Sequence, residues 1–341
     1  MNCQKYFILV LKIKGNFNYE KNNTLKKNKN PIQPVSGTKV PRFAGPSTFA
    51  RLPELRDVET CDVAIVGIPF DAGTSYRPGA RFGPQSIRQA SRHLRTNYHP
   101  NYDTEPFVEQ QVADAGDITC NPFNINEAIK QIEVGALDLL NKVGGIISLG
   151  GDHTIAFPLL KAVNKINKGP VALVHFDAHL DTWDTYFGAP YTHGTPFRRA
   201  REENLFLDDA SMHVGIRGPL YSRDDLKNDA EFGFKIIHCD EFQTEGIDKI
   251  VKRIKDRIGN NPLYLSIDID VLDPSHAPGT GTPEIAGMTT REMVNVLRGL
   301  AGVNLISADV VEVSPAYDHA ELTSLAAATI IYELTNLFAK A

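Results

Sequence analysis

The chain has few cysteines, no long apolar run and no excess of one charge, and each absence excludes a class of protein. Its four cysteines form no Cys-x-x-Cys pair, which argues against a zinc knuckle or a disulfide scaffold and favours a reducing compartment. No run approaches the roughly 20 apolar residues of a membrane span. A net charge of -5 over 341 residues gives no sign of a nucleic-acid footprint. We therefore expect a globular protein with neither nucleic acid nor membrane as a partner.

The first forty residues differ in composition from the rest of the chain. Lysines from Lys5 to Lys39 stand against a single acid, Glu20, among many asparagines. The apolar stretch from Tyr6 to Leu11 is shorter than the roughly 7 to 15 residues of a secretory signal, and the segment lacks the arginines typical of a mitochondrial presequence. We expect a disordered extension over residues 1–40, one folded domain over residues 41–341, and a cytoplasmic location, with a mitochondrial one as the alternative.

Short apolar runs alternate with helical patterns from Cys61 onward. Nearly continuous β-branched runs are typical of strands buried on both faces, as in a parallel sheet. The alternation predicts a single three-layer α/β/α domain with a central, mostly parallel sheet. The predicted strands are 63–68, 145–149, 171–176, 212–216, 235–239, 263–269 and 303–313. The predicted helices are 84–94, 125–142, 157–165, 247–258, 290–300 and 322–339.

Acid and histidine clusters follow three of the predicted strands, at 150–153 (GGDH), 177–181 (DAHLD) and 268–270 (DID). In an open parallel sheet, ligands gather beyond the carboxyl ends of the strands, so the three clusters can converge. An extended strand would separate Asp177 from Asp181 by roughly 13 Å, so the chain must curl between them. Asp268 and Asp270 are two residues apart and would share one face of a strand.

The clusters offer two imidazoles and four carboxylates but no thiolate. This set favours a hard divalent cation such as Mn²⁺, with Ni²⁺ or Co²⁺ still open. Six ligands exceed the need of one catalytic ion, which favours two ions that activate water for hydrolysis. Singly, each cluster is more often a turn, a helix cap or a buried core histidine, but three at equivalent sheet positions favour a metal site. The candidate ligands are His153, Asp177, His179, Asp181, Asp268 and Asp270.

The three motifs, in this order, resemble those of the ureohydrolases, the arginase and agmatinase family. The resemblance runs from about Val40 to the C-terminus and includes a third strand-end motif, SIDIDVLDP at 266–274. The stretches at 67–84 (GIPFDAGTSYRPGARFGP), 193–200 (HGTPFRRA) and 312–318 (EVSPAYD) are similar to the agmatinase branch. Arginases bind the substrate α-carboxylate with Asn and Ser residues after the second motif, whereas this loop, 182–192, reads TWDTYFGAPYT.

The resemblance implies an arginase-like catalytic domain with two Mn²⁺ ions per subunit. One ion would be held by His153, Asp177, Asp181 and Asp268, and the other by Asp177, His179, Asp268 and Asp270. A hydroxide between the ions would attack the guanidinium carbon, and Asp181 would accept a hydrogen bond that orients it. The resemblance also implies a homo-oligomer, a trimer or a hexamer.

Two further residues match catalytic groups of the family. Glu312 matches the carboxylate that binds the guanidinium, and His193 matches the proton-shuttling histidine. Independent arguments agree with both roles. A carboxylate after a strongly apolar strand is costly unless it meets a cation. An amine leaves only with a proton, which a side chain of unperturbed pKa about 6.5 can supply. Without the resemblance, His193 would be read as a surface histidine.

The sequence indicates the substrate class better than the substrate. The loop between Asp177 and His193 holds acidic and aromatic residues but no lysine or arginine, which favours agmatine, cleaved to putrescine and urea. Guanidinobutyrate, guanidinopropionate and free guanidine remain alternatives, because Arg198, Arg199 and Arg217 could reach an anion. Trp183 and its aromatic neighbours would form a cation-binding wall or only pack the loop. A catalytically silent binding protein is the alternative from another class, and single-metal deacetylases of related architecture are a third possibility.

Overall fold

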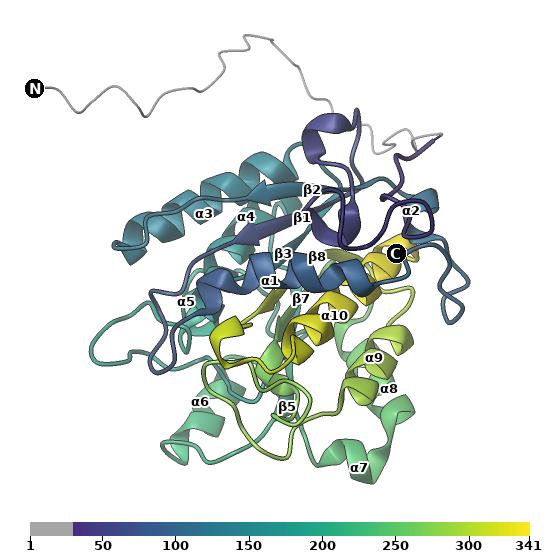
Figure 1. Ribbon diagram of the computed structural model, residues 1–341. Helices are drawn as coiled ribbons and strands as arrows, with labels where there is room; N and C mark the ends of the chain where they lie inside the picture. The colour runs from purple at the N-terminus through teal and green to yellow at the C-terminus, as the bar shows by residue number, and fades with distance from the viewer. Residues whose placement is uncertain (1–29) are drawn as a thin grey trace, which may run out of the picture.

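The computed structural model describes residues 30–341, which form a central sheet covered by helices on both faces (Figure 1). The sheet has eight strands in the order β2-β1-β3-β8-β7-β4-β5-β6, and every neighbouring pair is parallel. The strands are β1 Val63–Ile68, β2 Val112–Asp117, β3 Gly145–Gly150, β4 Ala172–Phe176, β5 Met212–Ile216, β6 Lys235–His238, β7 Leu263–Asp268 and β8 Leu305–Val311. The helices are α1 Gly83–Ala90, α2 Pro106–Glu109, α3 Ile125–Leu140, α4 Ala156–Asn167, α5 Pro196–Glu202, α6 Asp224–Glu231, α7 Glu241–Glu245, α8 Ile247–Ile258, α9 Thr290–Gly299 and α10 Leu322–Ala339.

Two apolar layers lie on opposite faces of the sheet. Successive residues of β3 show the alternation, since Ile147 packs into one layer and Ile146 into the other. The first layer contains buried residues of α1, α8, α9 and α10, and the second contains those of α3, α4 and α5. In Figure 1, α1 and α10 cross in front of the strands. The three-layer prediction is confirmed, and the sheet is parallel throughout.

Helix α10 is, among the described residues, the one helix whose length and composition would allow it to cross a membrane. However, 72% of its apolar window is buried inside the protein. It packs against α1, α9 and β8. The apolar side chains of α10 therefore pack in the core of this fold.

Strand β2 is not among the predicted strands. It is the edge strand of the sheet, paired with β1 on one side and with a single parallel bridge from Glu54 to Asp114 on the other, and its last residues, Gly116 and Asp117, are exposed. A strand with this position needs no continuous apolar run, so its sequence, VADAGD, gives a weak signal. Helix α6 is missing from the prediction for a similar reason, because Asp229 is its only buried residue.

The expectation that Asp268 and Asp270 share one strand face was wrong. Strand β7 ends at Asp268, and Ile269–Val271 forms one turn of 3₁₀ helix. The turn is favoured because the Asp268 carboxylate accepts a hydrogen bond from the Asp270 backbone N–H at 2.8 Å. The two carboxylates therefore project from a tight turn, and Asp268 lies beside His153 whereas Asp270 lies beside His179.

The predicted extension over residues 1–40 lies mostly outside the described residues. Its last part is bound to the domain: the Ile32 N–H donates to Gln111 Oε1 at 2.7 Å, and the Val35 N–H donates to the Arg51 carbonyl at 3.1 Å. The division of the chain near residue 40 stays a prediction.

Candidate metal centre and substrate cavity

Four adjacent strands in the middle of the sheet, β3, β8, β7 and β4, deliver the candidate residues. His153 lies just beyond β3, Asp177 directly follows β4, Asp268 ends β7, and Glu312 directly follows β8. All four residues are at most 3% exposed. Because the strands are parallel, their carboxyl ends meet at one edge, and the predicted convergence takes place there.

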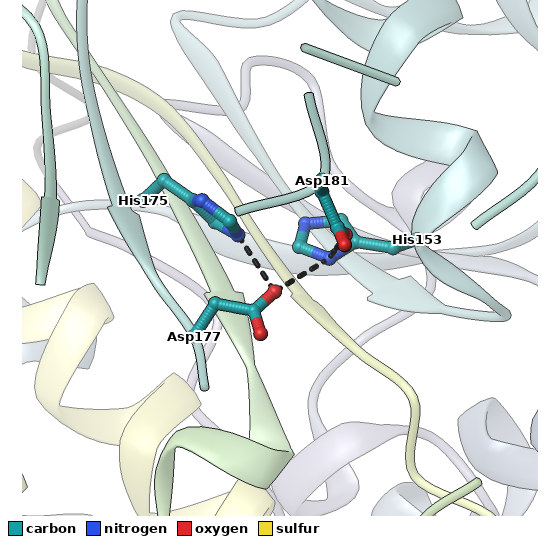
Figure 2. A group of neighbouring side chains, drawn as sticks. All are labelled: His153, His175, Asp177 and Asp181. Atoms are coloured by element: carbon teal, nitrogen blue, oxygen red, sulfur yellow. Dashed lines mark hydrogen bonds and ion pairs between the residues drawn. The ribbon is translucent and has the colours of Figure 1, made fainter. Parts of the chain in front are cut away.

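One group of ligand atoms surrounds the His153 ring. Its Nδ1 lies 3.2 Å from Asp177 Oδ2, 2.9 Å from Asp181 Oδ2 and 3.3 Å from Asp268 Oδ2. Figure 2 shows His153, Asp177 and Asp181 pointing toward one another. The chain curls after β4 as expected, and Asp181 takes a left-handed conformation with φ +55°, which is uncommon for a residue other than glycine.

The protonation of His153 follows from its other nitrogen. Ser266 Oγ donates a hydrogen bond to Asp309 Oδ1 at 2.8 Å, so at its 2.9 Å contact with His153 Nε2 the same oxygen accepts. Nε2 therefore carries a proton, and Nδ1 is the nitrogen that faces the three carboxylates. Nδ1 has no hydrogen-bond partner in the structure. Burial alone would lower the pKa of His153, but Asp177, Asp181 and Asp268 raise it well above its ordinary value, so a cation, either a proton or a metal ion, belongs at Nδ1. One imidazole nitrogen and three carboxylate oxygens are a donor set that fits a metal ion.

A second group adjoins the first through Asp177. His179 Nδ1 lies 3.2 Å from Asp177 Oδ1 and 3.2 Å from Asp270 Oδ2, and the latter oxygen is buried without a hydrogen-bond partner. The two oxygens of Asp177 thus face different groups, as in a carboxylate that bridges two ions. All six predicted ligands are brought together in these two groups.

The carboxylates of this centre carry more negative charge than a buried site tolerates alone. Burial, together with the charges of Asp270 and Asp177, raises the pKa of Asp268 well above its ordinary range. Burial and the Asp177 charge raise the pKa of Asp270 to about 6. Burial also favours the neutral form of Asp177, but the neighbouring histidines hold its pKa well below the usual value. The carboxylates can all be ionised at neutral pH only if cations share their charge.

A chain of buried groups behind Asp177 was not predicted. His175 Nε2 lies 2.7 Å from Asp177 Oδ2, as Figure 2 shows. His175 Nδ1 lies 2.7 Å from His213 Nδ1, and His213 Nε2 lies 3.0 Å from Asp229 Oδ1. The available signal was a histidine inside an apolar strand, in VHF of β4 and MHV of β5. These contacts help to fix the orientation of the Asp177 carboxylate.

Glu312 and His193 lie together beside the two groups of candidate ligands. Glu312 Oε1 accepts the His153 backbone N–H at 2.8 Å, whereas Oε2 is buried without a partner. The φ of Glu312 is +63°, a strained conformation of the kind found at functional sites. His193 Nδ1 lies 3.4 Å from Glu312 Oε1. Burial alone would lower the pKa of His193, but the hydrogen bond and charge of Glu312 raise it to about 9.

A cavity of about 540 Å³ is lined by His193 and by three of the candidate ligands, His179, Asp181 and Asp268. Trp183 and Tyr186 line it, and their rings meet edge to face at 5.8 Å. Tyr191 instead stacks on Phe157 at 5.9 Å, and Phe187 is 95% exposed. The aromatic side chains of loop 182–192 therefore lie in three places: in the cavity wall, in internal packing and at the surface.

The charged groups at the cavity differ from those considered in the sequence. Arg199 pairs with Asp184 and Glu202, and Arg217 donates to backbone carbonyls, including that of Asp270 at 2.6 Å. Neither lines the cavity. Arg77 and Glu284 do, and both come from loops far from the aromatic segment, so their proximity had no local sequence signal.

The buried histidine and carboxylate groups at the end of a parallel sheet define a metal-dependent hydrolase of the α/β class. Residues 61–336 match the model of the arginase family, and the chain belongs to that family. It is 46% identical to "Putative agmatinase 1" of Schizosaccharomyces pombe, covering 87% of this chain and 83% of that one. It is 43% identical to guanidinopropionase of Pseudomonas aeruginosa, covering 90% and 96%. The solved structure of proclavaminate amidino hydrolase from Streptomyces clavuligerus superimposes with a TM-score of 0.84 at 40% identity, covering 89% and 100%.

Proposed function

We propose that the protein hydrolyses the guanidino group of a small substrate to urea and an amine. One observation carries the proposal: His153 Nδ1 faces three carboxylates beside a second histidine–carboxylate group, and buried Glu312, whose Oε2 has no partner, lies next to them. A metal centre next to an unpartnered carboxylate suits a planar cation that must be held while water attacks it.

The proposed ligands of the two ions overlap. His153, Asp177, Asp181 and Asp268 would hold one ion, and Asp177, His179, Asp268 and Asp270 the other. Oxygen-rich coordination without thiolate favours Mn²⁺, with Ni²⁺ or Co²⁺ as alternatives. Two such ions supply water activated for hydrolysis at neutral pH.

We assign substrate binding, orientation of the water and proton transfer to side chains of the protein. Glu312 Oε2 accepts N–H groups of the substrate guanidinium and holds its plane in the cavity. Asp181 accepts a hydrogen bond from the attacking water and orients it. His193, which Glu312 keeps protonated, supplies the proton with which the amine departs. Trp183 forms a wall of the substrate cavity.

Agmatine is the substrate that we propose first. Its cationic tail suits the aromatic side chains and Glu284 of the cavity, and its product would be putrescine. A guanidino acid is the second candidate, because Arg77 also lines the cavity and could bind a carboxylate. Arg77 lies over the rings of Tyr76 and Tyr317, at 5.7 Å and 5.1 Å.

Urea release tests both the proposed hydrolysis and the proposed substrate. We would measure it for agmatine, guanidinobutyrate, guanidinopropionate, arginine and free guanidine, each with Mn²⁺ and then Ni²⁺. A preference above tenfold, about 1.4 kcal/mol in transition-state binding, identifies the substrate. Arg77→Met should selectively weaken turnover of a guanidino acid, and Glu284→Gln that of agmatine. Urea release that is unchanged in Asp177→Ala protein would refute the metal-dependent hydrolysis itself.

We further propose that the chain forms a trimer or a hexamer and acts in the cytoplasm, with the mitochondrion as the alternative. Light scattering on the purified protein tests the assembly, and imaging of the tagged full-length chain tests the compartment.

A further inference from the structure

A separate cavity of about 320 Å³ lies beside the carboxyl end of α1, away from the metal centre. Helix α1 begins next to the end of β3, because a Cβ on Gly83 would lie 2.7 Å from the Gly150 carbonyl oxygen. The helix runs from there toward Ser91, which lines the separate cavity. None of the residues that line this cavity lines the substrate cavity. It is therefore a different site from the proposed catalytic one.

The walls of this cavity, which we call the arginine pocket, carry positive charge. Among the described residues, those that line it include no aspartate or glutamate, whereas four are arginines: Arg42, Arg51, Arg92 and Arg95. Arg51 is only 4% exposed, and a buried guanidinium is normally paired with an anion because its removal from water is costly. The Asp103 carboxylate accepts a hydrogen bond from the Tyr98 hydroxyl at 3.1 Å and pairs with none of the four.

The hydrogen bonds of Arg51 and Arg92 go to neutral groups. Arg51 Nη1 donates to the carbonyls of Val40 and Pro41 at 3.1 Å and 3.2 Å, and Arg92 Nη2 donates to the Pro46 carbonyl at 3.0 Å. Arg92 Nε is buried without a partner. The carbonyl dipoles offset part of the two positive charges, but a carbonyl has no net charge with which to neutralise them.

Arg42 and Arg95 have donors available for a ligand. Neither side chain makes a hydrogen bond or an ion pair with another residue of the described chain, 30–341. Gly37 brings the Arg42 and Arg51 guanidinium groups close together, since a Cβ there would lie 3.1 Å from Arg42 Nε and 3.4 Å from Arg51 Nη2. Two like charges held so close favour an anion between or beside them.

We propose that the arginine pocket binds the phosphate group of a small molecule. The planar donor fork of an arginine matches two oxygens of a phosphate or a carboxylate. A phosphate ester carries a charge of about −1.5 to −2 at pH 7 and three acceptor oxygens, so it neutralises several arginines better than one carboxylate does. The volume of about 320 Å³ suits a small molecule. This site does not depend on the proposed guanidine hydrolysis.

Calorimetric titration of the metal-loaded protein with inorganic phosphate, and then with glycerol phosphate, tests the proposal at an ionic strength held constant with chloride. We expect saturable binding at one site per chain. Arg42→Met/Arg95→Met should weaken it about tenfold or more for each charge-assisted hydrogen bond that is lost. Thermal stability and metal content should not change, because neither side chain is bonded within the described chain. Arg291→Met, which removes an exposed arginine of α9, should leave the affinity unchanged.

Three results would overturn the proposal. Unchanged affinity in the double variant would place the anion elsewhere, such as at the metal ions. No saturable binding up to about 10 mM anion would exclude a phosphate site. Equal affinity for succinate, which carries two carboxylates, would contradict the assignment to phosphate. Arg95→Met alone changes only an exposed side chain and gives the same test if the double variant is unstable. The titration needs no turnover, so its outcome is independent of the urea assay.

Discussion

Replacing Asp270 by asparagine should stabilise the metal-free protein while destroying its metal site. The pKa of Asp270 is raised from 3.8 to about 6 by burial and by the Asp177 charge. A shift of about two units lowers the free energy of unfolding by about 3 kcal/mol when Asp270 is ionised. Both folded and unfolded chains bind the proton below pH 4, so this cost is absent there. It grows as the pH rises from about 4 to 6, where only the folded chain retains the proton, and is fully present above 6.

The asparagine can replace the existing contacts. Its side-chain oxygen can accept the Ala178 N–H, which now donates to Asp270 Oδ1 at 3.2 Å. His179 Nδ1, which lies 3.2 Å from Asp270 Oδ2, keeps its contact with Asp177 Oδ1, also at 3.2 Å. The variant also removes a charge that helps to raise the pKa of Asp268. We therefore expect Asp270→Asn to gain about 1–3 kcal/mol over the wild type at pH 7.5.

Denaturant unfolding of chelator-treated protein measures this effect. The difference between Asp270→Asn and the wild type should vanish near pH 4, and added Mn²⁺ should reverse the order at pH 7.5. An ion present at about 1,000 times its Kd stabilises the wild type by about 4 kcal/mol. Asp273→Asn is the matched control. It should lower the free energy of unfolding, because hydrogen bonds from Ser275 and Gly287 lower the pKa of Asp273 and so stabilise its ionised form. An Asp270→Asn protein less stable than the metal-free wild type at pH 7.5 would refute the reasoning.

Three further outcomes follow from the same geometry. Asp177→Asn should lower the bound metal from two ions per chain toward none, since both groups of ligands use this carboxylate. Mass spectrometry of the metal content checks this, and two retained ions would contradict a bridging role for Asp177. Glu312→Gln should keep the metal but lower kcat/KM by at least 100-fold, about 2.7 kcal/mol, because a neutral amide replaces the buried, unpartnered carboxylate proposed to bind the guanidinium; steady-state kinetics checks it. His213→Asn should weaken metal affinity about 10- to 100-fold, the usual effect of removing a supporting residue; competitive chelator titration checks it, and unchanged affinity would show that the buried chain does not orient Asp177.

The parts of the fold that the sequence predicted are those whose signal is local. The apolar runs of β1, β3 and β4 identify buried parallel strands, and the acids at their ends fall at one sheet edge by topology alone. β2 gave no such signal, because an edge strand can be half polar. The turn after Asp268 is set by a side-chain hydrogen bond to the backbone that an alternating pattern does not reveal.

The parts of the site that were missed depend on contacts between distant segments. Arg77 and Ser75 reach the cavity from the loop after β1, which the sequence alone does not place beside His193. His213 supports Asp177 through His175, and His213 and His175 come from neighbouring strands. The convergence of the candidate metal ligands was easier to predict, because each one lies within a few residues of a strand end.

The most direct test of a two-metal guanidine hydrolase is to measure metal content and urea release on one preparation. Chelator-stripped protein would receive Mn²⁺ in steps, and each sample would be assayed with the best substrate of the panel. We expect activity to rise with metal and to reach its plateau at two ions per chain, with no urea from stripped protein. Full activity without metal, or a plateau at one ion, would contradict the two-metal centre built around Asp177.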